Sequence, residues 1–143
     1  MLVDANLLLF ATDDTCPFHA AARDWLTERL NGPSRVGLPW QSLTAFLRIS
    51  THPRAFDTPL GPADAWAQIS TWLAREVTWI PAPGPRYTEI LGELVIRHHV
   101  GGKLVTDAQL AALALEHGLT VCSADTDFAR FTEVRWENPV APA

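Results

Sequence analysis

The sequence has few cysteines, no long apolar run and no basic start. Cys16 and Cys122 are the only cysteines among 143 residues, so a disulfide-stapled scaffold is excluded and both thiols are expected to be free. No Cys/His spacing is typical of a zinc site. No apolar run approaches the ~20 residues that a membrane helix needs. Asp4 interrupts the apolar start, near which there is no Lys or Arg, so we expect no signal peptide and a cytoplasmic protein.

Basic residues are also scarce. Eleven Lys and Arg stand against sixteen Asp and Glu, which gives a formal net charge of −5. This balance argues against a protein that holds nucleic acid by bulk charge alone, but not against an enzyme that meets phosphate through a bound metal ion. The hydrophobic fraction of 48% and six Trp suffice for one core, and we expect a single domain over residues 1–143.

Short apolar runs alternate with helical patterns along the chain. Strands are expected at residues 2–4, 35–38, 77–80, 119–122 and 134–136. Helices are expected at residues 16–30, 40–49, 62–73, 85–99 and 107–117, with a turn or short helix at 125–131. A polar loop that ends at Thr15 is expected after the first strand. The strand runs are mainly apolar and do not alternate with polar residues, which is typical of a parallel sheet covered on both faces, so the pattern predicts an α/β fold.

The helix predicted from residue 62 carries tryptophans that could serve the core or a partner. Its inward face is expected to hold Ala63, Trp66, Ile69 and Leu73. Trp72 falls off that face, and an exposed aromatic there is a candidate seat for a partner helix or a second copy of the chain.

Three isolated carboxylates lie at element boundaries. Asp4 ends the first apolar run, Asp107 opens the last long helix, and Asp125 follows the strand at 119–122. Burying a carboxylate in such apolar surroundings is costly without a partner. Sites in parallel sheets form beyond the carboxyl ends of the strands, where these residues can meet. The pattern predicts a shared acidic pocket whose natural occupant is a hard divalent cation.

Other polar residues flank these acids, and several interpretations stay open. Asp127 is as good a helix cap as a ligand, and Asp125 alone is compatible with a turn residue. Asn6 is placed to donate to Asp4 or to a substrate phosphate. Ser123 is placed to orient Asp125, or simply ends a strand. We list Asn6 and Ser123 as candidate substrate-binding residues.

Phosphodiester hydrolysis is a reaction that suits this pocket. It needs a nucleophilic water, neutralised charge at phosphorus and a stabilised leaving oxygen, and divalent ions supply all three. Mg²⁺ takes oxygen ligands and needs only a few carboxylates, and Mn²⁺ is a possible substitute. His98 and His99 invite a general-base role, but they close a helix, where histidine is favoured electrostatically.

Four stretches together resemble the PIN-domain VapC toxins of type II toxin–antitoxin modules. They are residues 3–6 (VDAN), 102–114 (GKLVTDAQLAALA) and 123–128 (SADTDF), with 39–56 (PWQSLTAFLRISTHPRAF) similar to one branch of the family. The resemblance implies a three-layer α/β/α fold with a small parallel sheet. It also implies a Mg²⁺-dependent endoribonuclease acting on structured RNA such as tRNA or rRNA, a VapB-type antitoxin partner and a homodimer.

By position in these motifs, Asp4, Asp107 and Asp125 match the acidic residues of the family, which are its metal ligands and catalytic residues, and Asp127 matches a less constant acid. One departure concerns the helix after the second strand, where most PIN domains carry a Glu. That place is occupied by Phe46, and residues 40–54 contain no carboxylate. Gln41, Ser42 or Thr44 are candidates for a neutral oxygen there.

Two other functions stay open at this point. A degenerate, non-catalytic PIN domain that binds RNA or a partner is compatible with the missing Glu. A phosphatase with an aspartyl nucleophile also begins with an Asp at the end of its first strand, but it needs a second Asp two residues later, and this chain has Asn6 there.

Overall fold

The computed structural model describes residues 1–142, which form five parallel strands and six α-helices. The strands are β1 (Leu2–Val3), β2 (Val36–Gly37), β3 (Thr78–Trp79), β4 (Val121–Cys122) and β5 (Trp136–Glu137). Their order in the sheet is β3-β2-β1-β4-β5, and all pairs are parallel. The predicted α/β fold with a parallel sheet is confirmed.

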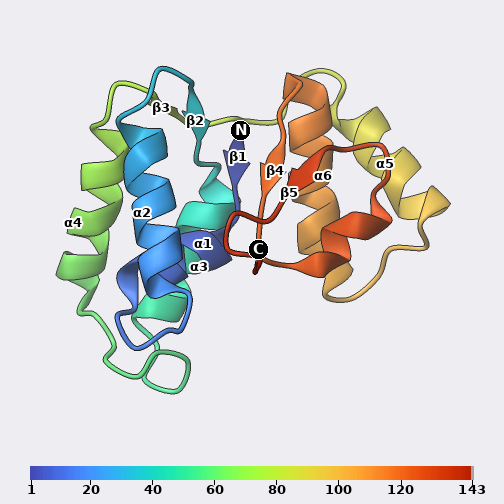
Figure 1. The fold of residues 1–143 in the computed structure, drawn as a ribbon. Helices are drawn as coiled ribbons and strands as arrows, with labels where there is room; N and C mark the ends of the chain where they lie inside the picture. Colours follow the sequence, from blue (N-terminus) through green and yellow to red (C-terminus); the bar gives the residue numbers. More distant parts are fainter. Residues whose placement is uncertain (143) are drawn as a thin grey trace.

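Helices cover both faces of the sheet. They are α1 (Ala5–Thr12), α2 (His19–Leu30), α3 (Trp40–Ser50), α4 (Pro62–Leu73), α5 (Tyr87–Arg97) and α6 (Leu104–His117), with a 3₁₀ helix η1 (Thr126–Arg130). Figure 1 shows α1 to α4 on one side of the strands and α5 and α6 on the other. The arrangement is the three-layer α/β/α fold. None of the helices within residues 1–142 combines the length and the apolarity that crossing a membrane requires.

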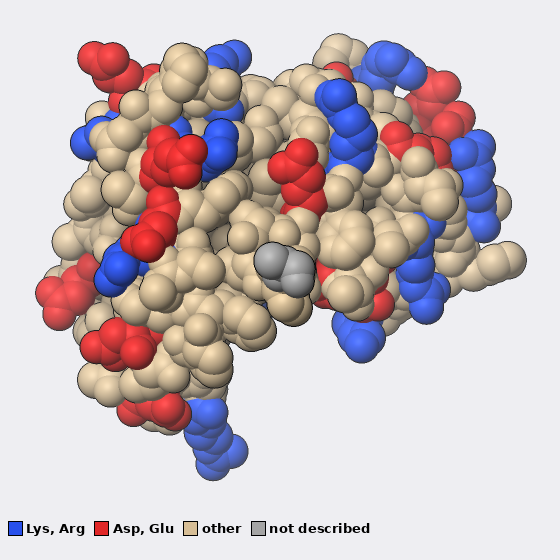
Figure 2. Space-filling model, in the orientation of Figure 1, with Lys and Arg blue, Asp and Glu red and all other residues tan. Residues whose placement is uncertain are grey.

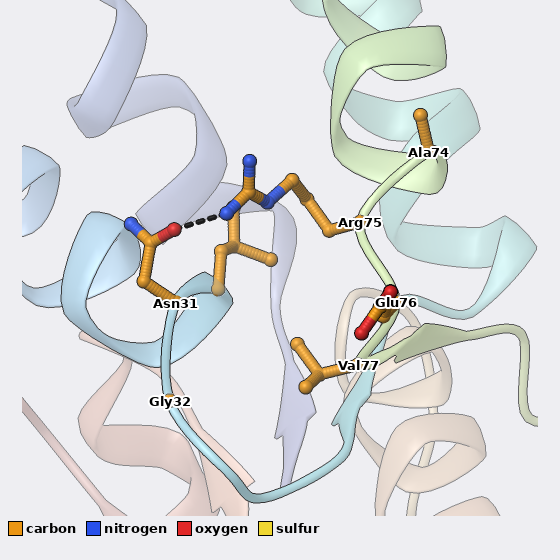
Figure 3. A pocket seen from close by; sticks show the side chains of 7 residues that line it. Asn31, Gly32, Ala74, Arg75, Glu76 and Val77 are labelled. Carbon is orange, nitrogen blue, oxygen red and sulfur yellow. Dashed lines mark hydrogen bonds between the residues drawn. The ribbon is translucent and has the colours of Figure 1, made fainter.

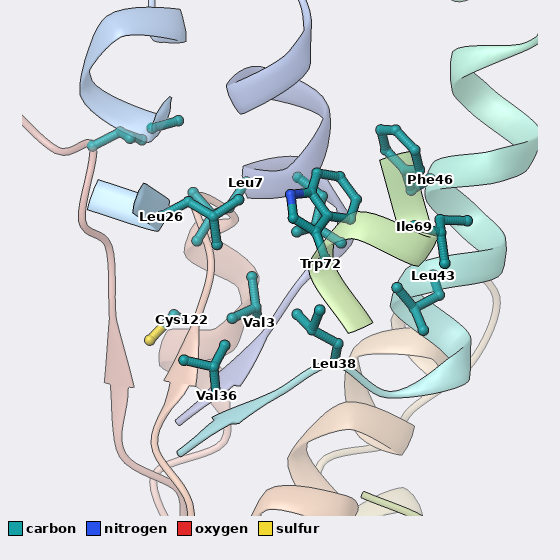
Figure 4. Packing of buried hydrophobic residues seen from close by; sticks show 13 residues of the cluster. Val3, Leu7, Leu26, Val36, Leu38, Leu43, Phe46, Ile69, Trp72 and Cys122 are labelled. Carbon is teal, nitrogen blue, oxygen red and sulfur yellow. The ribbon is translucent and has the colours of Figure 1, made fainter. Parts of the chain in front are cut away.

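Alternate residues of β1 supply two separate cores. Val3 packs with α1 to α4, whereas Leu2 packs with α5 and α6, because successive side chains of a strand point to opposite faces. In the first core Phe46 meets Trp72 edge-on with ring centroids 4.8 Å apart (Figure 4). Such an aromatic pair adds about 0.5–1.5 kcal/mol beyond the area it buries.

Gly37 in β2 shows how tightly the sheet is covered. A Cβ atom there would lie 2.8 Å from Cγ of Pro81 and 2.9 Å from the carbonyl oxygen of Met1. Only glycine lets these three segments approach one another.

The polar loop predicted between the first strand and Thr15 is wrong over residues 5–12, which form α1. Asp4 caps this helix, because its Oδ1 accepts the backbone N–H of Ala5 at 2.7 Å. Leu7 and Leu8 are fully buried in the first core. The segment is short and apolar, so its sequence alone fits a strand, a loop or a helix, and the cap and the packing decide.

The inward face predicted for α4 is wrong in part. Ile69 is buried and Leu73 packs against the first core, as predicted, whereas Trp66 is 48% exposed and Trp72 is buried. Small and apolar residues occur on all sides of α4, so periodicity alone allows several faces of the helix to be buried. The contact with Phe46 selects the face that carries Trp72. Trp72 is therefore a core residue and not a seat for a partner.

The remaining elements lie close to their predicted positions. Helix α6 begins at Leu104, three residues before its predicted start. Gly118 ends it with a left-handed φ of 68°, as the glycine signal predicts. Both cysteines are free, and burial raises the pKa of the Cys122 thiol to about 11.

Candidate metal centre

The strand order brings the ends of β1 and β4 together at the carboxyl edge of the sheet. The chain turns one way from β1 to β2 and β3 and then crosses back to β4, so the topological switch point, where parallel sheets bind ligands, lies between β1 and β4. The Asp4 backbone N–H donates to the Cys122 carbonyl oxygen at 3.0 Å and fixes the two ends side by side. Asp4 and Ser123 are thereby neighbours although 119 residues separate them.

Asp4 is held firmly at this edge. Its Oδ2 accepts the hydroxyl of Ser123 at 2.7 Å and the amide of Asn6 at 3.3 Å. Burial raises the pKa of the Asp4 carboxyl, and the charge of Asp125 raises it further. The hydrogen bonds from Ser123 and Ala5 oppose that rise without cancelling it.

Ser123 and Asn6 form the frame of the site. Ser123 Oγ accepts the Asn6 amide and the backbone N–H of Asp125, both at 3.0 Å. Asn6 Oδ1 accepts the backbone N–H of Ala124 at 3.2 Å. The geometry fits the prediction that Asn6 donates to Asp4 and that Ser123 orients Asp125. A contact of either residue with substrate stays a prediction.

Three carboxylates gather beside this frame. Asp107 lies in the first turn of α6, Asp125 caps η1, and the Asp127 backbone N–H donates to Asp125 Oδ1 at 2.8 Å. One carboxylate oxygen of each lies within 4.8 Å of the others. Asp4 is not part of this set of three, but its charge raises the pKa of Asp107. We call the four residues the acidic site.

Negative charge accumulates in the acidic site without compensation. Burial raises the pKa of the Asp107 carboxyl to about 7, and the charges of Asp125, Asp4 and Asp127 contribute in that order. Lys103 lowers it only in part. The donors are all carboxylate oxygens in close reach of one another, which is the donor set that a hard divalent ion prefers. The site therefore fits a metal ion, with Asp127 as well placed as the predicted ligands.

Phe46, to which the sequence motif assigns the place of the Glu, is a core residue. It is fully buried against Trp72 in the first core. The Ser42 hydroxyl donates to the carbonyl oxygen of Val3 at 2.7 Å, and the Thr44 hydroxyl donates to the Trp40 carbonyl oxygen at 2.7 Å. Gln41 is the candidate neutral oxygen whose side chain has no hydrogen bond within residues 1–142.

His98 lies away from the acids and has a structural role. Its Nε2 is 2.8 Å from Oε1 of Glu133, and its ring packs edge-on against Phe131. His99 is exposed, with a left-handed φ of 50°. The general-base role considered for this pair gains no support from these contacts.

Other hollows differ in place and chemistry from the acidic site. One of about 330 Å³ lies between the end of α2 and the segment from α4 to β3, where Arg75 donates to the side chain of Asn31 (Figure 3). On the face shown in Figure 2, Lys and Arg are interspersed with Asp and Glu and form no basic patch. This face agrees with the expectation that bulk charge does not attract a nucleic acid.

Comparison with protein families matches residues 1–134 to the PIN domain. The chain belongs to the PIN domain family. Ribonuclease VapC37 of Mycobacterium tuberculosis is 41% identical over 140 residues, which are 98% of this chain and 97% of that protein.

Solved structures show the same fold at lower identity. VapBC2 from Rickettsia felis, bound to a DNA fragment from its promoter, aligns with a TM-score of 0.71 and 15% identity over 96% of each chain. VapC20 of M. tuberculosis, a toxin that cleaves the sarcin–ricin loop, aligns with a TM-score of 0.68 and 18% identity over 94% of this chain and 98% of that one. In a PIN domain of this fold, a cluster of acids at the switch point is the natural place for a metal ion.

Sequence reasoning missed some features beside the acidic site. Arg48 is not among the candidate residues taken from the sequence, yet it lines a cleft between α3 and α6 together with Gln41 and Thr44. The signal was present, because polar residues 41, 44 and 48 recur at helical spacing on α3. The hydrogen bonds between Asn6 and Ser123 depend on the pairing of β1 with β4, which a single sequence does not reveal.

Proposed function

We propose that this chain is the toxin of a VapBC-type toxin–antitoxin module and cleaves RNA as a metal-dependent endoribonuclease. The observation that carries the proposal is the acidic site, in which Asp4 lies beside the close set of Asp107, Asp125 and Asp127. The family supports it, since relatives over nearly the whole chain are named VapC ribonucleases. Structured RNA such as tRNA or rRNA is the proposed substrate, and the VapC20 structure describes a toxin with a ribosomal RNA target.

Mg²⁺ is the proposed ion, with Mn²⁺ as a substitute. Asp4, Asp107 and Asp125 are its proposed ligands, and Asp127 joins them as a catalytic residue or further ligand. Once bound, the ion supplies a polarised phosphoryl oxygen and an acidified water. The raised pKa of Asp107 describes the carboxylates before an ion offsets their repulsion.

Neighbouring residues of the chain hold the carboxylates of the acidic site in position. Ser123 and Asn6 direct Oδ2 of Asp4 through two hydrogen bonds, and Ala5 donates to Oδ1, which leaves one acceptor position of Oδ1 for an ion. Asp125 is fixed by the N–H of Asp127, so its second oxygen is free to point to the same place. Such orientation lowers the cost of ordering ligands when ion and RNA arrive.

The proposal includes two protein partners. A VapB-type antitoxin inhibits the toxin, and two copies of the toxin form a homodimer. Structures of VapBC2 and VapBC-1, which share the fold, support this class of assembly. The proposed place of action is the cytoplasm.

The test is cleavage of purified tRNA and rRNA by the isolated protein. We expect cleavage with Mg²⁺ or Mn²⁺, none with a chelator, and loss in Asp4→Asn, a change that preserves the helix cap. Asp64→Asn, in the exposed first turn of α4, is the matched control and keeps activity. Cleavage that persists in the chelator would reject a metal-dependent enzyme, and binding without any cleavage would favour the degenerate PIN domain.

A further inference from the structure

A polar cleft of about 490 Å³ lies between α3 and α6. Its walls are formed by Gln41, Thr44, Ala45, Arg48, Thr106 and Gln109. The residues from α3 recur at helical spacing and form one stripe that faces α6. Thr106 directly precedes Asp107 on α6, so the wall that α6 gives to this cleft adjoins the acidic site in the sequence.

Arg48 is the charged residue in this lining. Its guanidinium forms no ion pair or hydrogen bond with any residue between 1 and 142, whereas Arg23 and Arg97 each pair with a carboxylate. A guanidinium with free donors, in a cleft whose lining includes the residue before Asp107, is suited to a phosphate oxygen, which it can bind through two parallel N–H groups. In a protein with a net charge of −5, such a contact must be local.

The rest of the lining is neutral and suits ribose and base edges. Gln41 and Gln109 offer amides that donate and accept, and Thr44 and Thr106 offer hydroxyl groups. Trp40, one residue before Gln41, is 44% exposed and presents an aromatic surface. Unpaired bases of RNA stack on such surfaces, and their sugars hydrogen-bond through the 2′-hydroxyl.

We propose that the cleft between α3 and α6 carries the RNA chain next to the acidic site, with Arg48 binding a phosphate beside the one that is cleaved. The inference rests on the proposed ribonuclease function and adds the part of the protein that holds the substrate. A second copy of the chain is the weaker occupant, because the buried centre of a protein interface is mainly apolar, whereas five of the six residues that line this cleft have polar side chains.

The first experiment compares Arg48→Ala, Arg48→Lys and the control Arg35→Ala in tRNA cleavage with Mg²⁺. Arg35 precedes β2, at the amino-terminal ends of the strands, and its guanidinium lies 4.1 Å from the centre of the Trp79 ring. Arg35→Ala therefore removes the same charge as Arg48→Ala at a place away from the cleft. We expect Arg48→Ala to raise KM about tenfold with kcat within about twofold, as for loss of uniform binding through one charged hydrogen-bond pair. Lysine should restore part of the loss, and Arg35→Ala should behave like the parent chain.

The second experiment measures binding of a fluorescein-labelled 12-nucleotide single-stranded RNA in an Asp107→Asn background, which prevents cleavage. Arg48→Ala should lower the dependence of log affinity on log salt by about 0.7. Circular dichroism and light scattering report fold and oligomeric state.

Equal KM and salt dependence in Arg48→Ala and Arg35→Ala would overturn the role of Arg48 while leaving the ribonuclease intact. A change in oligomeric state that accounts for the altered KM would assign the cleft to a second copy instead. If the parent chain cleaves no RNA at all, the proposed function fails, and the oligonucleotide titration still decides whether Arg48 binds RNA.

Discussion

Asp107 and Glu116 stand at opposite ends of the same helix, α6, and their carboxyl groups behave in opposite ways. Burial and three neighbouring acids raise the pKa of Asp107 to about 7, although the N-terminus of a helix favours negative charge. Burial also acts to raise the pKa of Glu116, but hydrogen bonds from the backbone N–H groups of Gly84 and Arg86, at 2.7 and 2.9 Å, lower it below its usual value.

The difference shows that hydrogen-bond donors and neighbouring charges, more than position in the helix, decide whether the pKa of a carboxyl group is raised or lowered. Glu116 ties α6 to the segment before α5, and Glu133 is satisfied in a similar way by His98 and Arg97. These acids serve the fold. In contrast, the acidic site assembles carboxylates that repel one another, which costs stability unless a cation enters. Acids whose charge is offset by donors and cations mark structure, and acids that are gathered so that their charges repel one another mark function.

The largest expected effect is on RNA cleavage, which should distinguish Asp107 from Glu116. Asp107→Asn should lower kcat/KM for RNA cleavage about a thousandfold, because a bound metal contributes several kcal/mol to the transition state. Glu116→Gln should stay within about twofold of the parent. Steady-state cleavage of tRNA with Mg²⁺ measures both. Similar losses in the two variants would show that the comparison of the two carboxylates does not identify the active site.

The next effect concerns binding of the ion itself. At a Mn²⁺ concentration of 100 times Kd, the chain should gain about 2.7 kcal/mol of stability, and Asp107→Asn should gain little. Glu116→Gln should gain as much as the parent. Thermal unfolding followed by circular dichroism at several ion concentrations measures the gain. An equal gain in Asp107→Asn would place the ion outside the acidic site.

Much of the fold was predictable because periodicity and end signals are local. The five strands and most helices follow from apolar runs and from Gly118, Pro39 and similar signals. Helix α1 was not predictable, because its eight mostly apolar residues fit a strand, a loop or a helix equally well. The Asp4 cap and the burial of Leu7 in the first core decide for the helix. The face of α4 was also unpredictable, because the contact between Trp72 and Phe46 joins two helices distant in sequence.

The candidate residues of the site could be named from the sequence, but the hydrogen bonds between them could not. Asp4, Asp107 and Asp125 stand out as isolated acids at element ends, and family motifs point to them as well. The hydrogen bond from Ser123 to Asp4 depends on strand order, which no local pattern contains. That Asp127 joins Asp107 and Asp125 within 4.8 Å follows from the turn of η1 and was open in the sequence.

A smaller effect tests that frame. Ser123→Ala removes the hydroxyl that donates to Asp4 and accepts from Asn6 and Asp125. Loss of such a supporting partner lowers metal affinity by about 10–100-fold. Calorimetric titration with Mn²⁺ measures the change, and Ser70→Ala on the exposed side of α4 is the control. Unchanged affinity would show that the carboxylates of the site keep their positions without this hydroxyl.

The smallest effect is the pH dependence of stability in the metal-free protein. The pKa of Asp107 is about 7 in the folded chain, above about 3.9 in the unfolded chain, so the unfolded state gives up its proton first as pH rises. The free energy of unfolding should therefore fall between about pH 4 and pH 7, and it should fall no further from this group above pH 7.

Asp107→Asn should remove most of this decline, and the raised pKa of Asp4 accounts for the rest. Solvent screens the site, so we expect a gain of about 1 kcal/mol in EDTA at pH 7.5, or about 3–5 °C in melting temperature. Glu116→Gln should act with the opposite sign. The pKa of Glu116 is lowered in the folded chain, so its ionised form stabilises the fold at pH values above its pKa in the unfolded chain, and this stabilisation is lost as pH falls. Urea unfolding from pH 4 to pH 8 measures all three chains. A parent stability that rises through neutral pH, or Asp107→Asn less stable than the parent at pH 7.5, would mean that the acidic site carries no uncompensated charge, and the contrast between the two ends of α6 would lose its basis.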